Sequence, residues 1–252
     1  MGESATATNR LSAGIQQAVS GLDFGKTHGE YWEQNECVFV ERFLPADLVE
    51  ATLVPEVQRL RPQVHRNYIP GHKKGGSISA FTLSQKAPIF LTLYTSPEFL
   101  AFLSRLVGAR LLLCPDNDPH ACALYYYTEP GDHIGYHYDT SHYQGARYTV
   151  LLGLVQRSER CRLVAQLHKD DPTRKVREIS LAYGPGDLVV FNGNKLWHAV
   201  TPLANGEERV VLTLEYVTNQ QMALPKRIFS NLKDAFAYFG PSALWPRRRP
   251  RP

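Results

Sequence analysis

Hydrophobic and polar positions alternate with two different periods along the chain. Before residue 110, apolar residues recur at helical spacing in 45–60 and again in 96–107, where Ser96 can cap the helix and Gly108 can end it. Short β-rich runs follow in 110–113, 121–127, 134–138, 148–155, 162–167, 177–181, 187–191, 198–200 and 209–217. A helical pattern returns in 227–239 and stops at Gly240.

This order of elements predicts a mainly β fold with flanking helices. About eight short strands separated by Gly, Pro and Asn turns are typical of a two-sheet β-sandwich or a jelly roll. We expect residues 1–30 to form an arm or a short helix, 36–41 a strand, and the basic, Gly-rich segment 66–76 a loop. One structural domain is expected: a helical and strand support region at 1–109, a β core with its closing helix at 110–240, and a disordered Pro/Arg tail at 241–252.

Composition narrows the class of protein. The net charge of +4 is mild and sits largely in the tail, so the domain itself does not suggest a nucleic-acid partner. No apolar run approaches the roughly 20 residues of a membrane span, and the N-terminus lacks a signal-peptide pattern. The 4 cysteines have no Cys-x-x-Cys spacing, which favours buried free thiols and a cytoplasmic location.

His137 and Asp139 are the first candidates for chemistry. On a strand, alternate side chains share a face, so this pair would present one imidazole and one carboxylate to the same point. One further histidine would complete a two-His-one-carboxylate set, which suits non-haem iron(II). Of the 9 histidines, His198 is the best placed, because it opens a short apolar strand after a strand and turn.

Arg209 needs a partner of its own. It stands at the start of the unbroken apolar strand 210–217, where an unpaired guanidinium would be costly to bury. A dicarboxylate co-substrate would supply that partner through a two-pronged contact. Thr213 lies on the same strand face as Arg209 and could donate its hydroxyl to the same carboxylate.

The order His137-x-Asp139, His198, Arg209 resembles the iron(II)- and 2-oxoglutarate-dependent dioxygenase superfamily. Tyr127-x-x-x-Gly131 and 185–187 resemble its prolyl-hydroxylase-like branch. The resemblance implies a double-stranded β-helix (a cupin-like jelly roll), with iron(II), 2-oxoglutarate and O2 as cofactors and ascorbate as an assisting reductant. It assigns the metal ligands, which are also the catalytic residues, to His137, Asp139 and His198, and co-substrate binding to Arg209, Thr213, Tyr127 and Thr149.

A narrower resemblance involves the segments 72–77, 128–133 and 195–198. They are similar to a subgroup that acts on free amino acids and includes lysine hydroxylases and radical halogenases. In those halogenases glycine replaces the carboxylate ligand, whereas this chain keeps Asp139, which implies hydroxylation. The expected reaction is hydroxylation of an aliphatic C–H of a free amino acid such as lysine, with release of succinate and CO2. Candidate substrate contacts are Lys74, His120, Glu129, Asp132 and Thr140, while Arg66, Lys73, Asp116, Asp118 and Glu215 offer further charges.

Two alternatives remain open at this point. A prolyl-hydroxylase-like enzyme could use the same chemistry on a protein side chain. A non-enzymatic β-sandwich binding module could carry the histidines and the aspartate incidentally, although Arg209 at the head of an apolar strand counts against it. We expect a small-molecule partner, no membrane and no nucleic acid, and the sequence makes no prediction of the oligomeric state.

Overall fold

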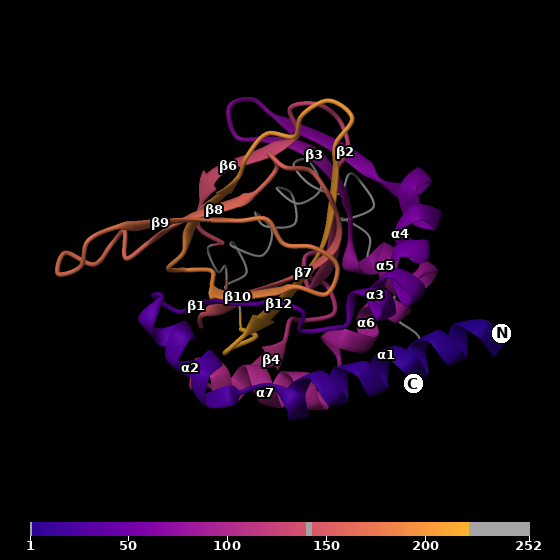
Figure 1. Ribbon diagram of the computed structural model, residues 1–252, viewed down its shortest axis with the longest axis horizontal. Coiled ribbons are helices and arrows are strands. Elements are labelled where there is room, and N and C mark those ends of the chain that lie inside the picture. The colour runs from indigo at the N-terminus through magenta and orange to yellow at the C-terminus, as the bar shows by residue number, and fades with distance from the viewer. Residues whose placement is uncertain (1, 140–142, 222–252) are drawn as a thin grey trace.

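The computed structural model describes residues 2–139 and 143–221. Its strands form one mostly antiparallel sheet that curls into a half-barrel, the jelly-roll core expected from the sequence (Figure 1). The order of strands in the sheet is β1-β10-β7-β12-β5-β3-β6-β11-β8-β9, with β2 beside β3 and β4 beside β12. The strands are β1 (Cys37–Val40), β2 (His65–Ile69), β3 (Lys73–Ile78), β4 (Leu112–Leu113), β5 (Cys122–Tyr127), β6 (His133–His137), β7 (Arg147–Arg157), β8 (Leu163–Leu167), β9 (Arg177–Leu181), β10 (Leu188–Asn192), β11 (Trp197–Val200) and β12 (Glu208–Val217).

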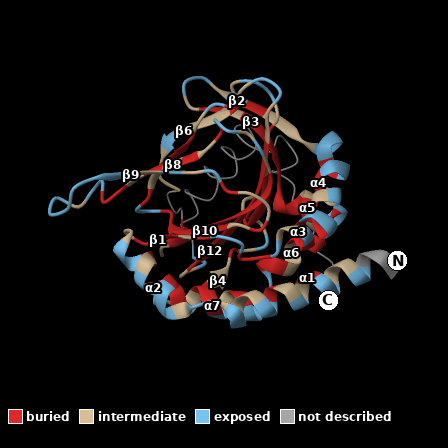
Figure 2. Cartoon of the chain, viewed as in Figure 1, coloured by how far each residue is buried: buried red, intermediate tan, exposed pale blue. Residues whose placement is uncertain are grey.

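Helices cover the outer side of this sheet, as the sequence predicts (Figure 1). They are α1 (Gly2–Gly21), α2 (Phe24–Glu33), α3 (Ala46–Thr52), α4 (Val54–Leu60), α5 (Ala80–Lys86), α6 (Ile89–Tyr94) and α7 (Pro97–Val107), with a short 3-10 turn at Arg61–Gln63. A large apolar cluster fills the space between helices and sheet. A smaller cluster lies inside the curl, and the two together leave the sheet buried on both faces over much of its length (Figure 2).

Local sequence signals account for α7. The Ser96 side chain accepts a hydrogen bond from the backbone N–H of Phe99, and Pro97 occupies the first turn. Gly108 ends the helix in the left-handed conformation, with a φ of 68°. Phe99, Phe102 and other apolar residues of one face are buried, so this helix confirms the prediction.

Other elements differ from the predictions. The helix expected at 45–60 is divided into α3 and α4 around Leu53, since Pro55 occupies the first turn of α4. The prediction of a loop at 66–76 is wrong, because β2 and β3 form a hairpin there. Gly76 permits that pairing at close range, because a Cβ at this position would lie 2.4 Å from the Val64 side chain. The N-terminal arm is two helices, α5 and α6 were not predicted, and the helix at 227–239 and the tail lie outside the described residues.

The four cysteines are free and buried, as predicted. Among residues 2–139 and 143–221, the structure contains no helix with the length and apolarity that crossing a bilayer requires.

Candidate active site

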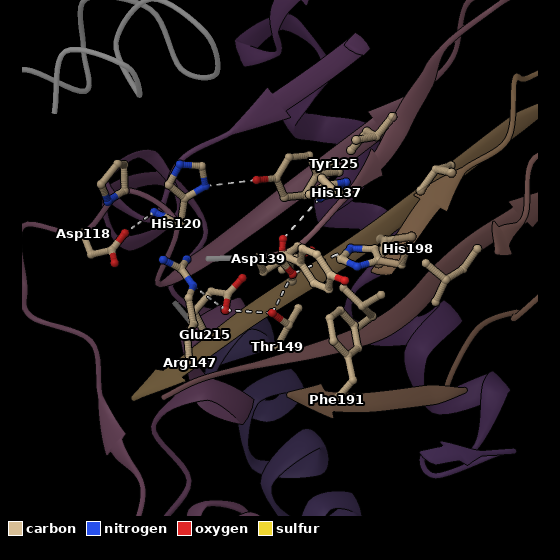
Figure 3. Close-up of a pocket in the computed structure, with 18 of the residues that line it drawn as sticks. Asp118, His120, Tyr125, His137, Asp139, Arg147, Thr149, Phe191, His198 and Glu215 are labelled. Atoms are coloured by element: carbon tan, nitrogen blue, oxygen red, sulfur yellow. Dashed lines mark hydrogen bonds and ion pairs between the residues drawn. The ribbon is translucent and has the colours of Figure 1, made fainter. Parts of the chain in front are cut away.

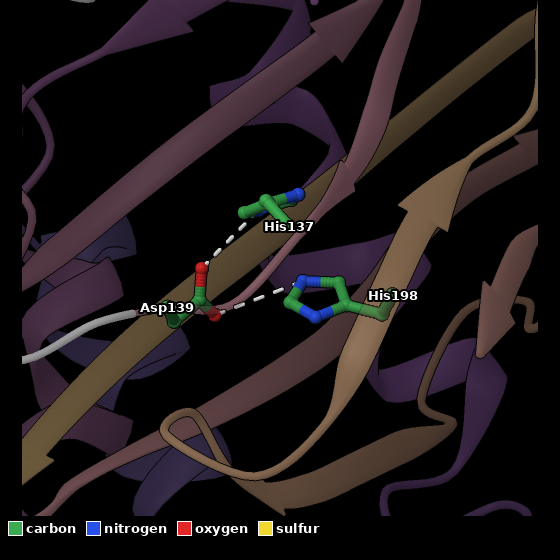
Figure 4. Close-up of side chains that lie close together, drawn as sticks. All are labelled: His137, Asp139 and His198. Atoms are coloured by element: carbon green, nitrogen blue, oxygen red, sulfur yellow. Dashed lines mark ion pairs between the residues drawn. The ribbon is translucent and has the colours of Figure 1, made fainter. Parts of the chain in front are cut away.

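Two neighbouring strands and one loop bring three metal-ligand side chains together. His137 ends β6 and pairs directly with His198 on β11, so the two imidazoles face each other with ring centroids 4.3 Å apart. Asp139 follows the end of β6, with its Oδ1 3.3 Å from His137 Nε2 and its Oδ2 3.8 Å from His198 Nε2 (Figure 4). One ligand atom from each residue lies within 4.8 Å of the others, a spacing that suits a single metal ion.

Backbone contacts orient both imidazoles. Nδ1 of His137 lies 2.9 Å from the carbonyl of Gly135, and Nδ1 of His198 lies 3.0 Å from the carbonyl of Leu196. A carbonyl oxygen only accepts, so Nδ1 carries the proton in each ring. The lone pair is therefore left on Nε2, the atom that faces Asp139. This arrangement fixes the tautomer that a metal ligand needs.

The charge state of Asp139 also fits a metal ligand. Burial by itself would raise the pKa of this carboxyl, but His198, His137 and Arg147 together hold the pKa well below its usual range. Burial lowers the pKa of His198, which keeps that imidazole neutral. An ionised carboxylate beside a neutral imidazole is the form in which both bind a divalent cation.

Gly193 gives Asp139 the space it occupies. A Cβ on Gly193 would lie 2.8 Å from the Cβ of Asp139 and 2.9 Å from its carbonyl oxygen. We expect Gly193→Ala to displace Asp139 and to weaken metal binding by about 10- to 100-fold, the range seen when groups around a metal ligand are disturbed. Titration of the apo-protein with Co²⁺ measures this effect. Gly29→Ala adds the same methyl group where no atom lies within 4 Å and should bind Co²⁺ like the wild type, so equal affinities in the two variants would contradict the assignment.

A second buried group lies at one end of the same cavity. Arg209 on β12 is only 2% exposed and pairs in register with Tyr127 on β5. Its guanidinium stands over the rings of Tyr127 and Tyr183, 5.1 and 4.7 Å from their centroids, and donates a hydrogen bond to the Tyr183 hydroxyl. Within residues 2–139 and 143–221, its Nε has no hydrogen-bond partner. A buried cation with an unused donor fits an anionic group that binds from the cavity.

Another wall of the cavity is built from charged and hydroxyl side chains of β7 and β12 (Figure 3). Thr149 Oγ1 lies 2.8 Å from Asp139 Oδ2 and 3.0 Å from Glu215 Oε2. Arg147 Nε donates to the same Glu215 oxygen over 2.9 Å. Burial raises the pKa of Glu215 to about 8 against the opposing charge of Arg147. The Thr149 hydroxyl has a single proton to donate, and Asp139 Oδ2 is the nearer of the two carboxylate oxygens that can accept it.

The metal-ligand residues, Arg209 and the charged wall all line one cavity of about 390 Å³. Of the other residues selected from the sequence, Tyr127, Thr149 and Thr213 line it, as does His120, whose Nδ1 lies 3.1 Å from the Tyr125 hydroxyl. Lys74, Glu129 and Asp132 do not line it. Asp132 instead forms a two-pronged ion pair with Arg66, at 2.6 and 2.8 Å. Thr140 lies outside the described residues.

Tyr183, Arg147 and Tyr143 line the cavity but were not selected from the sequence as site residues. Tyr183 lies two residues before the segment 185–187 but is not part of the pattern that this segment carries, and only the tertiary structure brings it to Arg209. Arg147 and Tyr143 follow the ligand segment in the sequence. Arg147 pairs with Val217, at the other end of β12 from Arg209. The Tyr143 hydroxyl donates to Asp118 Oδ2 over 2.8 Å, which adds a second carboxylate to the charged wall. For Arg147 the signal available in the sequence was an arginine at the head of an apolar strand, the same signal that identified Arg209.

Solved structures share this fold at low sequence identity. The epimerase SnoN, solved with Fe³⁺, alpha ketoglutarate and nogalamycin RO, aligns with a TM-score of 0.65 and 16% identity over 91% of this chain and 94% of its own. A Pseudomonas putida prolyl-4-hydroxylase aligns with a TM-score of 0.58 and 18% identity over 79% and 100%. HygX from Streptomyces hygroscopicus, solved with nickel and 2-oxoglutarate, aligns with a TM-score of 0.54 and 12% identity over 76% and 86%. At these identities the likeness shows the fold.

The sequence itself matches a protein family over most of its length. No curated protein matches the chain. The family model HalD, described as halogenase D, matches residues 25–235. This span begins in α2 and includes β1 to β12 and all the cavity residues named above. The chain therefore belongs to the halogenase D family.

Proposed function

We propose that this protein is an iron(II)- and 2-oxoglutarate-dependent oxygenase that hydroxylates an aliphatic C–H of a small polar molecule, and that a free amino acid such as lysine is its substrate. The observation that carries the proposal is the pairing of two features in one cavity. The ligand atoms of His137, Asp139 and His198 lie within 4.8 Å of one another. The buried Arg209 has an Nε without a hydrogen-bond partner in the described part of the chain. A metal site alone would not need that arginine, and a structural ion pair would have satisfied it.

Separate residues would bind the metal and the co-substrate. His137, Asp139 and His198 would hold the metal, with Nε2 of each imidazole directed to it. Arg209 would bind the far carboxylate of 2-oxoglutarate, oriented by Tyr127 and Tyr183. When bound, iron and 2-oxoglutarate supply the oxidising chemistry, in which O2 is consumed, the co-substrate becomes succinate and CO2, and one oxygen atom enters the substrate. The protein provides the ligand geometry and positions the co-substrate.

Asp139 supports hydroxylation over halogenation. The halogenases that the sequence resembles have glycine at this position, which leaves space for a halide ion. Here the carboxylate of Asp139 fills it, 3.3 and 3.8 Å from the two imidazoles. A halide would have to share the position with a fixed negative charge, which is unfavourable.

The size and polarity of the cavity support a small substrate with charged ends. About 390 Å³ lies near the lower end of the range for small-molecule sites, roughly 300–1,000 Å³. Its lining away from Arg209 includes Asp118, Arg147 and Glu215. A carboxylate and a guanidinium on one wall can pair with the amino and carboxylate groups of an amino acid.

The test is a succinate-release screen over the free amino acids with iron(II), 2-oxoglutarate and ascorbate. We expect substrate-dependent succinate with at least one basic amino acid, and a product heavier by one oxygen atom. Asp118→Asn should raise the KM of that substrate by about 10-fold, because the proposed ion pair between the Asp118 carboxylate and the amino group of the substrate is lost. The KM for 2-oxoglutarate should stay the same. If an added protein is oxidised and no free amino acid is, the substrate is a protein side chain and not a free amino acid. An absence of any metal or 2-oxoglutarate binding would favour the non-enzymatic alternative.

A further inference from the structure

We propose that Thr149 is a positioning residue for Asp139: its hydroxyl holds one carboxylate oxygen, so that Asp139 offers a metal ion only the other. The inference rests on the proposed function in one respect, that a metal binds at His137, Asp139 and His198. It goes beyond that function because the sequence pattern and the family likeness assign no such role to Thr149.

The geometry distinguishes the two oxygens of Asp139. Each oxygen faces one imidazole, Oδ1 at 3.3 Å from Nε2 of His137 and Oδ2 at 3.8 Å from Nε2 of His198 (Figure 4). Only Oδ2 also accepts a hydrogen bond from Thr149 Oγ1, at 2.8 Å (Figure 3). An oxygen that already accepts a hydrogen bond is a weaker donor to a cation than its free neighbour. Oδ1 is therefore the oxygen available for the metal.

Neighbouring strands hold the hydroxyl in place. Thr149 is 1% exposed on β7, opposite Glu215 on β12 and Phe191 on β10. Glu215 Oε2 lies 3.0 Å from the Thr149 hydroxyl and is itself fixed by Arg147 Nε at 2.9 Å. A chain of contacts thus runs from Arg147 through Glu215 and Thr149 to Asp139. Arg147, Glu215 and Thr149 are buried, and Asp139 is partly exposed. A β-branched side chain on a strand has few rotamers, so the direction of the Thr149 hydroxyl is fixed before any metal binds.

A carboxylate held in this way contributes one ligand atom instead of two. A two-His-one-carboxylate site depends on open positions for a co-substrate and for oxygen, and a two-pronged carboxylate would take one of them. The Thr149 hydroxyl is therefore expected to affect how tightly and with which geometry a metal is bound, even when no 2-oxoglutarate or substrate is present.

The experiment compares two variants that differ in the hydroxyl. Thr149→Val keeps the shape of the side chain and loses the hydrogen bond, whereas Thr149→Ser keeps the hydroxyl and loses a methyl group. Each full-length apo-protein is titrated with Co²⁺ without 2-oxoglutarate, and the visible absorption of the complex is recorded. We expect Thr149→Val to bind Co²⁺ about 10- to 100-fold more weakly with a changed spectrum, and Thr149→Ser to remain within about 3-fold of the wild type with an unchanged spectrum. Thr149→Ala, which also loses the hydroxyl and makes no steric demand, should behave like Thr149→Val.

The possible outcomes separate the role of Thr149 from the proposed function. Wild-type affinity and spectrum in both Thr149→Val and Thr149→Ala would overturn the role of Thr149 and leave the proposed function intact. Equal weakening in Thr149→Ser would also overturn it, because the loss would then come from packing and not from the hydroxyl. A wild-type protein that binds no Co²⁺ would instead remove the proposed function itself.

Discussion

Asp139→Gly is expected to lower substrate hydroxylation by more than about 100-fold while the protein stays folded. Changes in the groups around a metal ligand already cost about 10- to 100-fold, and this change removes the ligand itself. The carboxylate lies 3.3 and 3.8 Å from the imidazole Nε2 atoms, so the two histidines would be left without their anionic partner. Hydroxylated product, quantified by mass spectrometry at saturating iron and 2-oxoglutarate, measures the loss.

Asp139→Asn is the matched control for shape. It keeps the hydrogen-bond acceptor for Thr149 but removes the charge, so its residual activity separates the charge of the ligand from its volume. If Asp139→Gly kept more than a tenth of the wild-type rate, Asp139 would not be a metal ligand. Assays in chloride answer a further question, since the chain belongs to the halogenase D family. Chlorinated product from Asp139→Gly and none from the wild type would show that this carboxylate decides which group is transferred.

Asp139 also shows how far strand periodicity can predict a site. The sequence placed His137 and Asp139 on one face of a strand, but β6 ends at His137. Asp139 reaches the imidazoles from the segment beyond the strand, and the absence of a side chain on Gly193 allows that approach. The His137-x-Asp139 spacing therefore identified two residues that do lie together, although Asp139 is not on the strand that the spacing assumed. Contacts of this kind depend on a turn some fifty residues away, which no local pattern contains.

The strands were predictable because their apolar runs are bounded by turn residues, and the segment 66–76 was not. Its basic and glycine-rich composition is typical of loops, yet the neighbouring strands impose pairing on it. The same limit applies to the cavity. His198 and Arg209 stand out in the sequence because a polar group within an apolar strand needs a reason. Tyr183 has no such contrast with its neighbours, so only the tertiary structure shows that it contacts Arg209.

Arg209→Met is expected to weaken 2-oxoglutarate binding by about 100- to 4,000-fold, since removal of one partner of a buried charge pair costs about 3–5 kcal/mol. Two tyrosine rings pack on the guanidinium, and among the described residues its Nε has no hydrogen-bond partner. The carboxylate of the co-substrate would therefore lose the contact that offsets its desolvation. Arg209→Lys keeps the charge but not the two-pronged geometry, and its affinity should lie between those of the wild type and Arg209→Met.

Two measurements separate this effect from damage to the metal site. Anaerobic titration of the iron-loaded protein with 2-oxoglutarate, followed by its metal-to-ligand absorption, gives the loss of affinity. Titration of the apo-protein with Co²⁺ should give the wild-type value in both variants, because Arg209 is not one of the metal-ligand residues. The Tm of the ligand-free protein should rise or stay level in Arg209→Met, since an apolar side chain replaces a buried cation whose Nε is unsatisfied. A normal affinity for 2-oxoglutarate combined with a fall in Tm would mean that Arg209 supports the fold and does not bind the co-substrate.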